Sequence, residues 1–256
     1  EYKIVFKQLY ESLEREQPDY IIHTGDIAHT KTQLSPEYFE LCSDFLKNLA
    51  DIAPTYIILG NHDGNLKNDN RQDAITPIIE ALGHPNLHLL KNAGETKLGK
   101  KFTLNVLSVF DRDNWTKPSS KSKINIALYH GAIRGCQISD RFTLESGEDT
   151  ISIFDGFDYA MLGDIHRRQH LDEDGRIWYA GSTVQQNHGE TNDKGILIWD
   201  IESKDDWDIE PIVFKNPKPF VTLELTQKGR MPKGAIVPEG ARLRLVSNNN
   251  LPLSVM

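Results

Sequence analysis

Four short apolar stretches of this chain each end in a cluster of polar residues, and this repetition constrains the fold more than any other feature. The clusters are Gly25-Asp26, Gly60-Asn61-His62-Asp63, His130-Gly131 and Gly163-Asp164-Ile165-His166. A short apolar run bounded by turn residues is typical of a buried strand, and glycine lets the backbone turn sharply after it. In open α/β sheets, functional sites form where loops leave the carboxyl ends of strands. We therefore expect the four strand ends to converge on one rim.

The residue types in these clusters favour a divalent metal ion. Aspartate, asparagine and histidine at the ends of buried strands need partners, because burying an unpaired polar or charged group is costly. A hard divalent cation can bind all three residue types. A Gly-Asp or His-Gly pair alone is most often an ordinary turn, and Gly-Asn-His-Asp alone can form an Asx turn. The joint occurrence of four such clusters in this order favours the metal site.

The apolar pattern predicts an α/β fold that becomes richer in strands along the chain. Helices are expected over residues 2–16, from Ser35-Pro36 onward and, more weakly, over about 72–82, with Ser35 as N-cap and proline at the first helical position. The expected strands are 20–22, 56–59, 87–90, 102–110, 124–129, 159–162, 177–180, 196–199, 209–214, 220–225 and 241–246. The proline-rich stretch 216–219 indicates a linker to a small second domain.

Composition limits the classes of protein that this chain can represent. Its 256 residues suit one or two domains, and no apolar run approaches the roughly 18 residues of a membrane helix. The net charge of −8 argues against a protein that coats nucleic acid through bulk charge, although a local basic groove stays possible. Two cysteines are too few for a disulfide framework, and they fit a reducing compartment. We expect a cytoplasmic protein, in the host cytoplasm if the gene is a phage gene.

The order of the four clusters resembles the motif set of the calcineurin-like metallophosphoesterases. Within that superfamily, residues 19–29 are similar to the segment around the Gly-Asp motif of SbcD and the Mre-type DNA double-strand-break repair nuclease subunits, which include phage recombination nucleases. Residues 179–190, followed by Lys194-Gly195, resemble a second segment of those nucleases, and residues 219–246 resemble the start of their capping domain.

This resemblance implies the architecture. Residues 1–215 would form a four-layer α/β/β/α sandwich, the metallophosphoesterase or nuclease domain. Residues 216–256 would begin a small α+β capping domain that is truncated here.

The resemblance also implies a set of metal ligands. Asp26 would bridge two manganese ions, with magnesium as the other possibility. Asn61 and His130 would bind the second metal together with Asp164. His166 would bind the first metal.

Other residues take supporting roles by the same resemblance. His62 would not bind metal; it is the candidate general acid that protonates the leaving 3′ oxygen or steadies the phosphate charge. His29 and Asp63 would orient the ligands. Arg167 and Arg168 are candidate DNA contacts because guanidinium suits phosphate geometry, although salt bridges to acidic residues explain them nearly as well.

The sequence departs from the family pattern in two places. The superfamily opens with an Asp-x-His motif, which does not occur before Asp26 and should lie upstream of Glu1. We therefore expect this chain to hold at most the second metal firmly, or to be inactive if that motif is truly absent. In addition, Asp164 stands where the family usually has histidine. Because carboxylates favour harder ions, we expect manganese or magnesium to be preferred over zinc.

These features favour a metal-dependent DNA exonuclease and endonuclease of repair or recombination. The resemblance implies an SMC-like ATPase partner of the SbcC/Rad type and dimerisation through the nuclease domains. One alternative is a phosphodiesterase or phosphatase of the same superfamily that acts on small substrates. A second alternative is a non-catalytic protein that binds DNA ends, for which the missing first motif is the only support.

Overall fold

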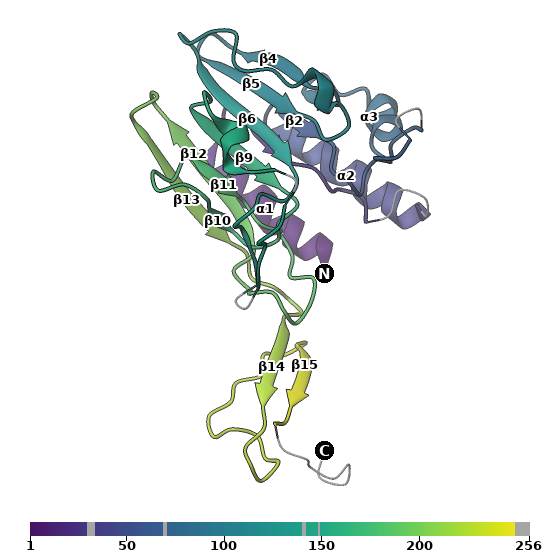
Figure 1. The fold of residues 1–256 in the computed structure, drawn as a ribbon. Coiled ribbons are helices and arrows are strands. Elements are labelled where there is room, and N and C mark those ends of the chain that lie inside the picture. The colour runs from purple at the N-terminus through teal and green to yellow at the C-terminus, as the bar shows by residue number, and fades with distance from the viewer. Residues whose placement is uncertain (30–33, 69–70, 140–141, 148, 249–256) are drawn as a thin grey trace.

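The computed structural model of the chain describes residues 1–29, 34–68, 71–139, 142–147 and 149–248. Residues 249–256, the end of the expected second domain, lie outside the described residues. Two β-sheets lie face to face, and helices cover the outer face of one of them (Figure 1).

The first sheet is short and fully parallel, in the order β1-β2-β3. Its strands are β1 (Ile21–His23), β2 (Thr55–Ile58) and β3 (Leu87–Leu90). The helices that pack with this sheet are α1 (Tyr2–Glu16), α2 (Pro36–Ile52) and α3 (Thr76–Leu82), and α2 and α3 connect its strands. Helix α2 begins as the sequence predicts, because the Ser35 hydroxyl accepts a hydrogen bond from the Tyr38 backbone N–H at 3.2 Å and Pro36 occupies the first turn.

The second sheet is larger and mixed, in the order β10-β11-β9-β6-β5-β4. Its strands are β4 (Gly94–Leu98), β5 (Phe102–Leu107), β6 (Ile124–His130), β9 (Tyr159–Gly163), β10 (Gln169–His170) and β11 (Ile177–Tyr179). The four central strands run parallel, and β4 and β10 close the edges in the antiparallel direction. Parallel central strands place their carboxyl ends on one side of the sheet.

Alternation along the strands divides the core into layers. Ile57 packs with Leu46 of α2 on the helical side, whereas its neighbour Ile58 packs between the two sheets. In the second sheet, Leu128 faces the first sheet and Tyr129 faces outward. All five side chains are buried, and each contributes about 1.5–3 kcal/mol by leaving water.

The outward face of the second sheet is covered by a segment without long helices. This segment includes the 3₁₀ helices η1 (Arg112–Asn114) and η2 (Ile151–Phe154). Phe154 and Trp115 pack edge-on against Tyr129 there, with ring centroids 5.9 Å apart in both pairs. The predicted α/β class, with two sheets between two covering layers, is confirmed.

Three two-stranded pairs complete the described chain. They are β7 (Gln137–Ser139) with β8 (Phe142–Thr143), β12 (Gly195–Ile201) with β13 (Trp207–Val213), and β14 (Phe220–Glu224) with β15 (Arg242–Val246). The β14–β15 pair projects away from the main body in Figure 1. Arg242 nevertheless reaches Glu1 with two hydrogen bonds, of 3.1 and 2.5 Å. The domain boundary at residue 216 stays a prediction.

Two predicted elements are shorter than expected. Helix α3 begins at Thr76 rather than at residue 72, because the Asp73 carboxylate accepts hydrogen bonds from the N–H groups of Ile75 and Thr76 and holds a turn before the helix. Strand β5 ends at Leu107, since the Ser108 carbonyl accepts from the N–H of Asp111 and starts a turn. None of the helices in the described part of the chain is long and apolar enough to cross a bilayer.

Candidate metal centre

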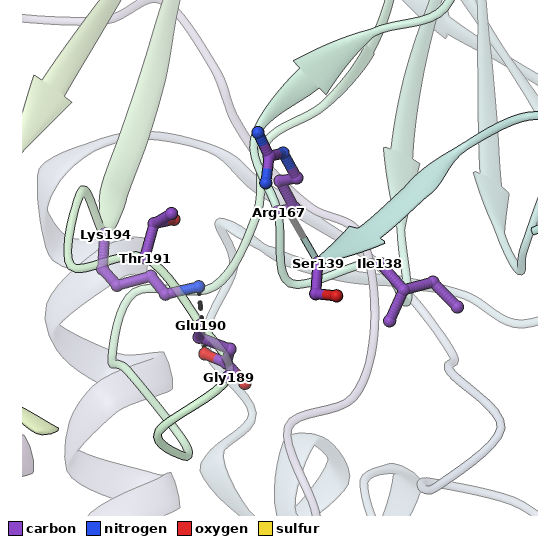
Figure 2. Close-up of a pocket in the computed structure, with 7 residues that line it drawn as sticks. All are labelled: Ile138, Ser139, Arg167, Gly189, Glu190, Thr191 and Lys194. Carbon is purple, nitrogen blue, oxygen red and sulfur yellow. Dashed lines mark ion pairs between the residues drawn. The ribbon is translucent and has the colours of Figure 1, made fainter. Parts of the chain in front are cut away.

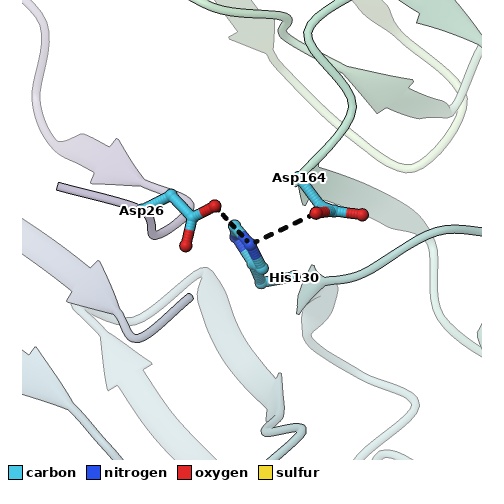
Figure 3. Close-up of side chains that lie close together, drawn as sticks. All are labelled: Asp26, His130 and Asp164. Atoms are coloured by element: carbon cyan, nitrogen blue, oxygen red, sulfur yellow. Dashed lines mark ion pairs between the residues drawn. The ribbon is translucent and has the colours of Figure 1, made fainter. Parts of the chain in front are cut away.

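Three of the predicted ligands meet at the carboxyl ends of strands. Asp26 follows β1, His130 is the last residue of β6, and Asp164 follows β9. Each offers one ligand atom, and these atoms all lie within 4.8 Å of one another (Figure 3). The strand ends come from both sheets, since β1 belongs to the first sheet and β6 and β9 to the second. The expected rim is therefore a junction between two sheets.

His130 occupies the centre of this group. It is 2% exposed, and its Nδ1 lies 2.6 Å from the Thr24 carbonyl oxygen, which can only accept a hydrogen bond. A neutral ring therefore carries its proton on Nδ1 and a lone pair on Nε2. Nε2 lies 3.3 Å from Asp26 Oδ2 and 3.9 Å from Asp164 Oδ1, and it has no hydrogen-bond partner among the described residues. A cation between these three atoms would satisfy all of them.

The protonation equilibria reflect the same crowding of charge. Desolvation opposes protonation of His130, but the nearby Asp26 carboxylate outweighs it and raises the pKa of the imidazole above its usual value. Burial raises the pKa of Asp164. Burial acts on Asp26 in the same direction, but His130 and the His62 backbone N–H outweigh it and lower the pKa of that carboxyl. A proton therefore competes with a metal ion for this site.

Two glycines permit the close approach of the loops. A Cβ atom at Gly163 would lie 2.0 Å from the Thr24 carbonyl oxygen and 2.7 Å from His130 Nδ1. A Cβ atom at Gly60 would lie 2.1 Å from Asp26 Oδ1. These distances exclude any side chain at either position, which explains why glycine stands before the polar residues in both clusters.

The two aspartates of the group have unusual backbone conformations. Asp26 has φ of 59° and Asp164 has φ of 88°, both in the left-handed region that few residues other than glycine adopt. Aspartate tolerates this region better than most residues. Strained residues of this kind concentrate at functional sites, where the surrounding structure holds them.

Asp63 joins the first two clusters through backbone hydrogen bonds. Its side chain is fully buried, and its Oδ2 accepts from the N–H groups of Asp26 and Gly60, each at 2.8 Å. Its Oδ1 accepts from the Ala28 N–H at 2.8 Å. Asn61 lies in the same loop, directly after Gly60, and is half-buried. The position of Asp63 thus agrees with the orienting role that the sequence predicts for it, although the role itself stays a prediction.

His62 and His29 lie beside this loop. The His62 N–H donates to Asp26 Oδ1 at 2.9 Å, and its Nδ1 lies 2.8 Å from the His29 carbonyl oxygen. The two rings stack with centroids 6.0 Å apart, and both residues are exposed. Because the carbonyl can only accept, Nδ1 of His62 carries a proton, and Nε2 stays available to a substrate.

His166 and the two arginines after it lie outside the three-residue group. The His166 side chain is exposed, and its Nδ1 lies 2.9 Å from Glu190 Oε1. Arg168 pairs with Asp193 at 3.1 Å, which is the salt-bridge alternative that the sequence left open. Arg167 lines a small pocket together with residues of β7 and of the segment before β12; the other lining residues are Ile138, Ser139, Gly189, Glu190, Thr191 and Lys194 (Figure 2). The role of Arg167 and Arg168 as DNA contacts stays a prediction.

Sequence reasoning assigned no role to three residues near the site. Glu190 and Lys194 form a buried ion pair with 3.0 Å between Nζ and Oε2. The sequence signal that could have found them is an acidic and a basic residue four positions apart in the segment that resembles SbcD-type nucleases. Burial lowers the pKa of His23 to about 4, and its Nδ1 accepts from the Gly25 N–H at 3.2 Å. The sequence signal for His23 is its position between the apolar run Ile21-Ile22 and Gly25, at the end of a buried strand.

Carboxylates and an imidazole at the joined carboxyl ends of two facing sheets define, with this fold, a metallophosphoesterase domain. The chain belongs to the calcineurin-like phosphoesterase family, whose sequence profile matches residues 3–168. Members of this class are hydrolases that use divalent metal ions, so the predicted superfamily is confirmed. The matched range contains all the predicted site residues from Asp26 to Arg168.

Three proteins similar to this chain come from two viruses and a bacterium. It is 37% identical to an uncharacterized protein of Acanthamoeba polyphaga mimivirus over 97% of this chain and 19% of the relative. It is 26% identical to one of the subunits of the nuclease SbcCD of Staphylococcus epidermidis, over 78% of this chain and 60% of the relative. A protein of Invertebrate iridescent virus 6 named as a phosphoesterase is also 26% identical, over 70% of this chain and 63% of the relative. The chain therefore spans less than two thirds of each relative.

Proposed function

We propose that this chain is the catalytic domain of a manganese-dependent DNA nuclease of the SbcD type. The observation that carries the proposal is His130 Nε2, which lies between the carboxylates of Asp26 and Asp164 without a hydrogen-bond partner among the described residues. The similarity to a component of the nuclease SbcCD over 78% of the chain supports DNA as the substrate.

Four residues would hold one ion of the centre. They are Asp26, Asn61, His130 and Asp164, which would hold the second metal, whereas His166 would hold the first metal together with Asp26. The donor set fits hard or borderline divalent ions, since it combines carboxylate and amide oxygens with imidazole nitrogen. When bound, the ions polarise the phosphodiester and lower the pKa of a coordinated water so that it becomes a nucleophile near neutral pH.

The protein's own groups would then handle the proton and the substrate. His62 is fixed through Nδ1 to the His29 carbonyl, so its imidazolium form would donate the Nε2 proton to the leaving 3′ oxygen and keep the Nδ1 proton. Asp63 holds the backbone of both metal-bearing loops through three hydrogen bonds. Arg167 stands one residue after His166, where a guanidinium can bind the phosphate of the DNA backbone.

A partner protein would supply much of the DNA affinity. The relative from Staphylococcus epidermidis is named as one subunit of a larger nuclease. A chain with a net charge of −8 gains little from non-specific attraction to DNA. We therefore propose an SMC-like ATPase of the SbcC/Rad type as the partner, and manganese as the ion in use.

The test compares three substrates in the presence of Mn²⁺: single-stranded DNA, bis-p-nitrophenyl phosphate and a phosphopeptide. The proposal expects metal-dependent DNA cleavage that a chelator abolishes and that His62→Ala lowers by a factor of about 10²–10⁴. His84→Ala is the matched control, because His84 contacts Asp51 of α2 and lies outside the site. Hydrolysis of the small ester without DNA cleavage would favour a small-substrate phosphodiesterase, and hydrolysis of the phosphopeptide would favour a phosphatase. DNA binding without cleavage would favour a non-catalytic protein that binds DNA ends.

A further inference from the structure

A buried ion pair stands directly behind His166. Glu190 Oε1 lies 2.9 Å from His166 Nδ1, and Glu190 Oε2 lies 3.0 Å from Lys194 Nζ. The side chains of Glu190 and Lys194 are only 8% and 4% exposed. The side chain of His166, in contrast, is 45% exposed, so the packing around the ring does little to restrict its rotation.

The same segment also holds the backbone of His166. Lys194 Nζ donates to the His166 carbonyl oxygen at 2.6 Å, and the Ser182 N–H donates to it at 3.3 Å. Gly181, with φ of 79°, brings the chain so close that a Cβ there would lie 3.1 Å from this oxygen. The segment 181–195 therefore contacts both the backbone carbonyl and the ring of His166.

The carboxylate that holds the ring is itself immobilised. Glu190 Oε1 accepts a second hydrogen bond from Asn187 Nδ2 at 2.9 Å, and Oε2 accepts from the Gln186 N–H at 3.0 Å. Lys194 compensates the buried negative charge. Both Glu190 oxygens are thus occupied, and the carboxylate cannot leave the imidazole without breaking several bonds.

Such a carboxylate controls which ring nitrogen carries the proton. Glu190 accepts from Nδ1–H, so it stabilises the tautomer whose Nε2 presents a lone pair to a metal ion. Without this carboxylate, the Nδ1–H tautomer of the neutral imidazole would lose the acceptor that stabilises it. Both Glu190 and Lys194 lie beyond residues 3–168, which the family profile matches.

We propose that Glu190 is a positioning residue that selects the tautomer and orientation of His166, with Lys194 as its counter-charge. This inference rests on the proposed function, because it takes His166 as a metal ligand. The strand ends form the metal centre, and the inference adds the segment 181–195 as a support for one of its ligands.

The first test reads the tautomer of His166 in metal-free protein. Long-range proton–nitrogen NMR at pH 8 distinguishes the two tautomers of each of the nine histidines, and loss of one signal in His166→Ala identifies the residue. We expect the Nδ1–H form in the wild type and predominantly the Nε2–H form in Glu190→Ala. Glu202→Ala is the matched control, since Glu202 is 74% exposed and pairs only loosely with Lys101 at 3.8 Å.

The second test measures Mn²⁺ binding by calorimetry. Loss of a carboxylate that orients a metal-binding histidine weakens metal binding by about 10–100-fold. We expect this loss in Glu190→Ala, but not in Glu202→Ala, for the weaker of the two Mn²⁺ ions, which is the one that His166 would hold. If Glu190→Ala does not fold, Glu190→Leu combined with Lys194→Met removes both charges and keeps the side-chain volume, with the same two results expected.

The possible outcomes separate the two proposals. A His166 that keeps the Nδ1–H form after loss of the Glu190 carboxylate overturns the positioning role, even if Mn²⁺ binds. Unchanged affinity for the Mn²⁺ ion that His166 would hold overturns it as well, whereas the affinity for the ion assigned to Asn61, His130 and Asp164 should stay the same. A wild-type chain that binds no Mn²⁺ overturns the proposed function, whatever tautomer His166 adopts.

Discussion

Gly163 lies where the two sheets meet, and Gly163→Ala tests whether that junction builds the metal centre. The added methyl group would lie 2.0 Å from the Thr24 carbonyl oxygen, whereas ordinary van der Waals contact begins at 3.4 Å. The gap must therefore open by the difference, about 1.4 Å. Thr24 is backbone, so no flexible side chain can move out of the way.

The cost of this change has two components. Inserting a methyl group into a closely packed site costs about 1–3 kcal/mol, and a clash with backbone belongs at the upper end of that range. The Thr24 carbonyl also accepts the hydrogen bond of His130 Nδ1, which contributes about 1 kcal/mol and breaks when the gap opens. We expect the free energy of unfolding of Gly163→Ala to fall by about 3–4 kcal/mol.

The same displacement should impair metal binding. A metal site tolerates ligand displacements of only about 0.2 Å, so moving Thr24 and His130 apart should weaken Mn²⁺ binding at least about 10-fold. Urea denaturation and calorimetry measure the two effects. The control is Gly156→Ala, which has φ of 92° and open space around the site of its Cβ. That control should lose about 1–2 kcal/mol through backbone strain and keep its Mn²⁺ affinity. Gly163→Ala with wild-type stability and Mn²⁺ affinity would refute the reasoning.

Three further predictions concern the charges in and around the site. Mn²⁺ affinity should fall as the pH falls through the pKa of His130, because a proton then competes with the ion. Desolvation opposes protonation of His130, but Asp26 outweighs it and raises this pKa. Equal Mn²⁺ affinities by calorimetry at pH 6 and pH 8 would contradict this prediction. Asp164→His should shift the preference from manganese towards zinc, and an unchanged ratio of the two affinities would count against carboxylate control of the metal. Asp73→Ala should lower the free energy of unfolding by about 2 kcal/mol at pH 7, because it removes the acceptor of two backbone N–H groups and the partner of Lys91. Burial alone would raise the pKa of Asp73, but Lys91 and these donors outweigh it and lower the pKa. The stability that the carboxylate contributes is therefore present above its usual pKa of 3.8 and is lost as the pH falls below that value. Urea denaturation should show a smaller difference in unfolding free energy between variant and wild type at pH 3 than at pH 7.

Local patterns were sufficient to predict much of this molecule. Apolar runs closed by glycine predicted β1, β2, β6 and β9 to within one or two residues, and Ser35 predicted the start of α2. These signals depend only on neighbours in the chain: a buried strand needs consecutive apolar residues, and a helix start needs an acceptor for its first N–H groups. The residues of the candidate metal centre, Asp26, His130 and Asp164, were predicted for the same reason.

Other parts of the site depend on residues distant in the chain, and the tertiary structure alone decided them. No local pattern states that β1 and β6 belong to different sheets whose ends meet at His130, since that follows from the packing of apolar faces over the whole core. The contact of Glu190 with His166 spans 24 positions in the chain and depends on a loop that folds back behind the site. The amino-acid sequence thus determined which chemical groups stand at the strand ends, whereas the packing of two sheets and one returning loop decided which of them touch.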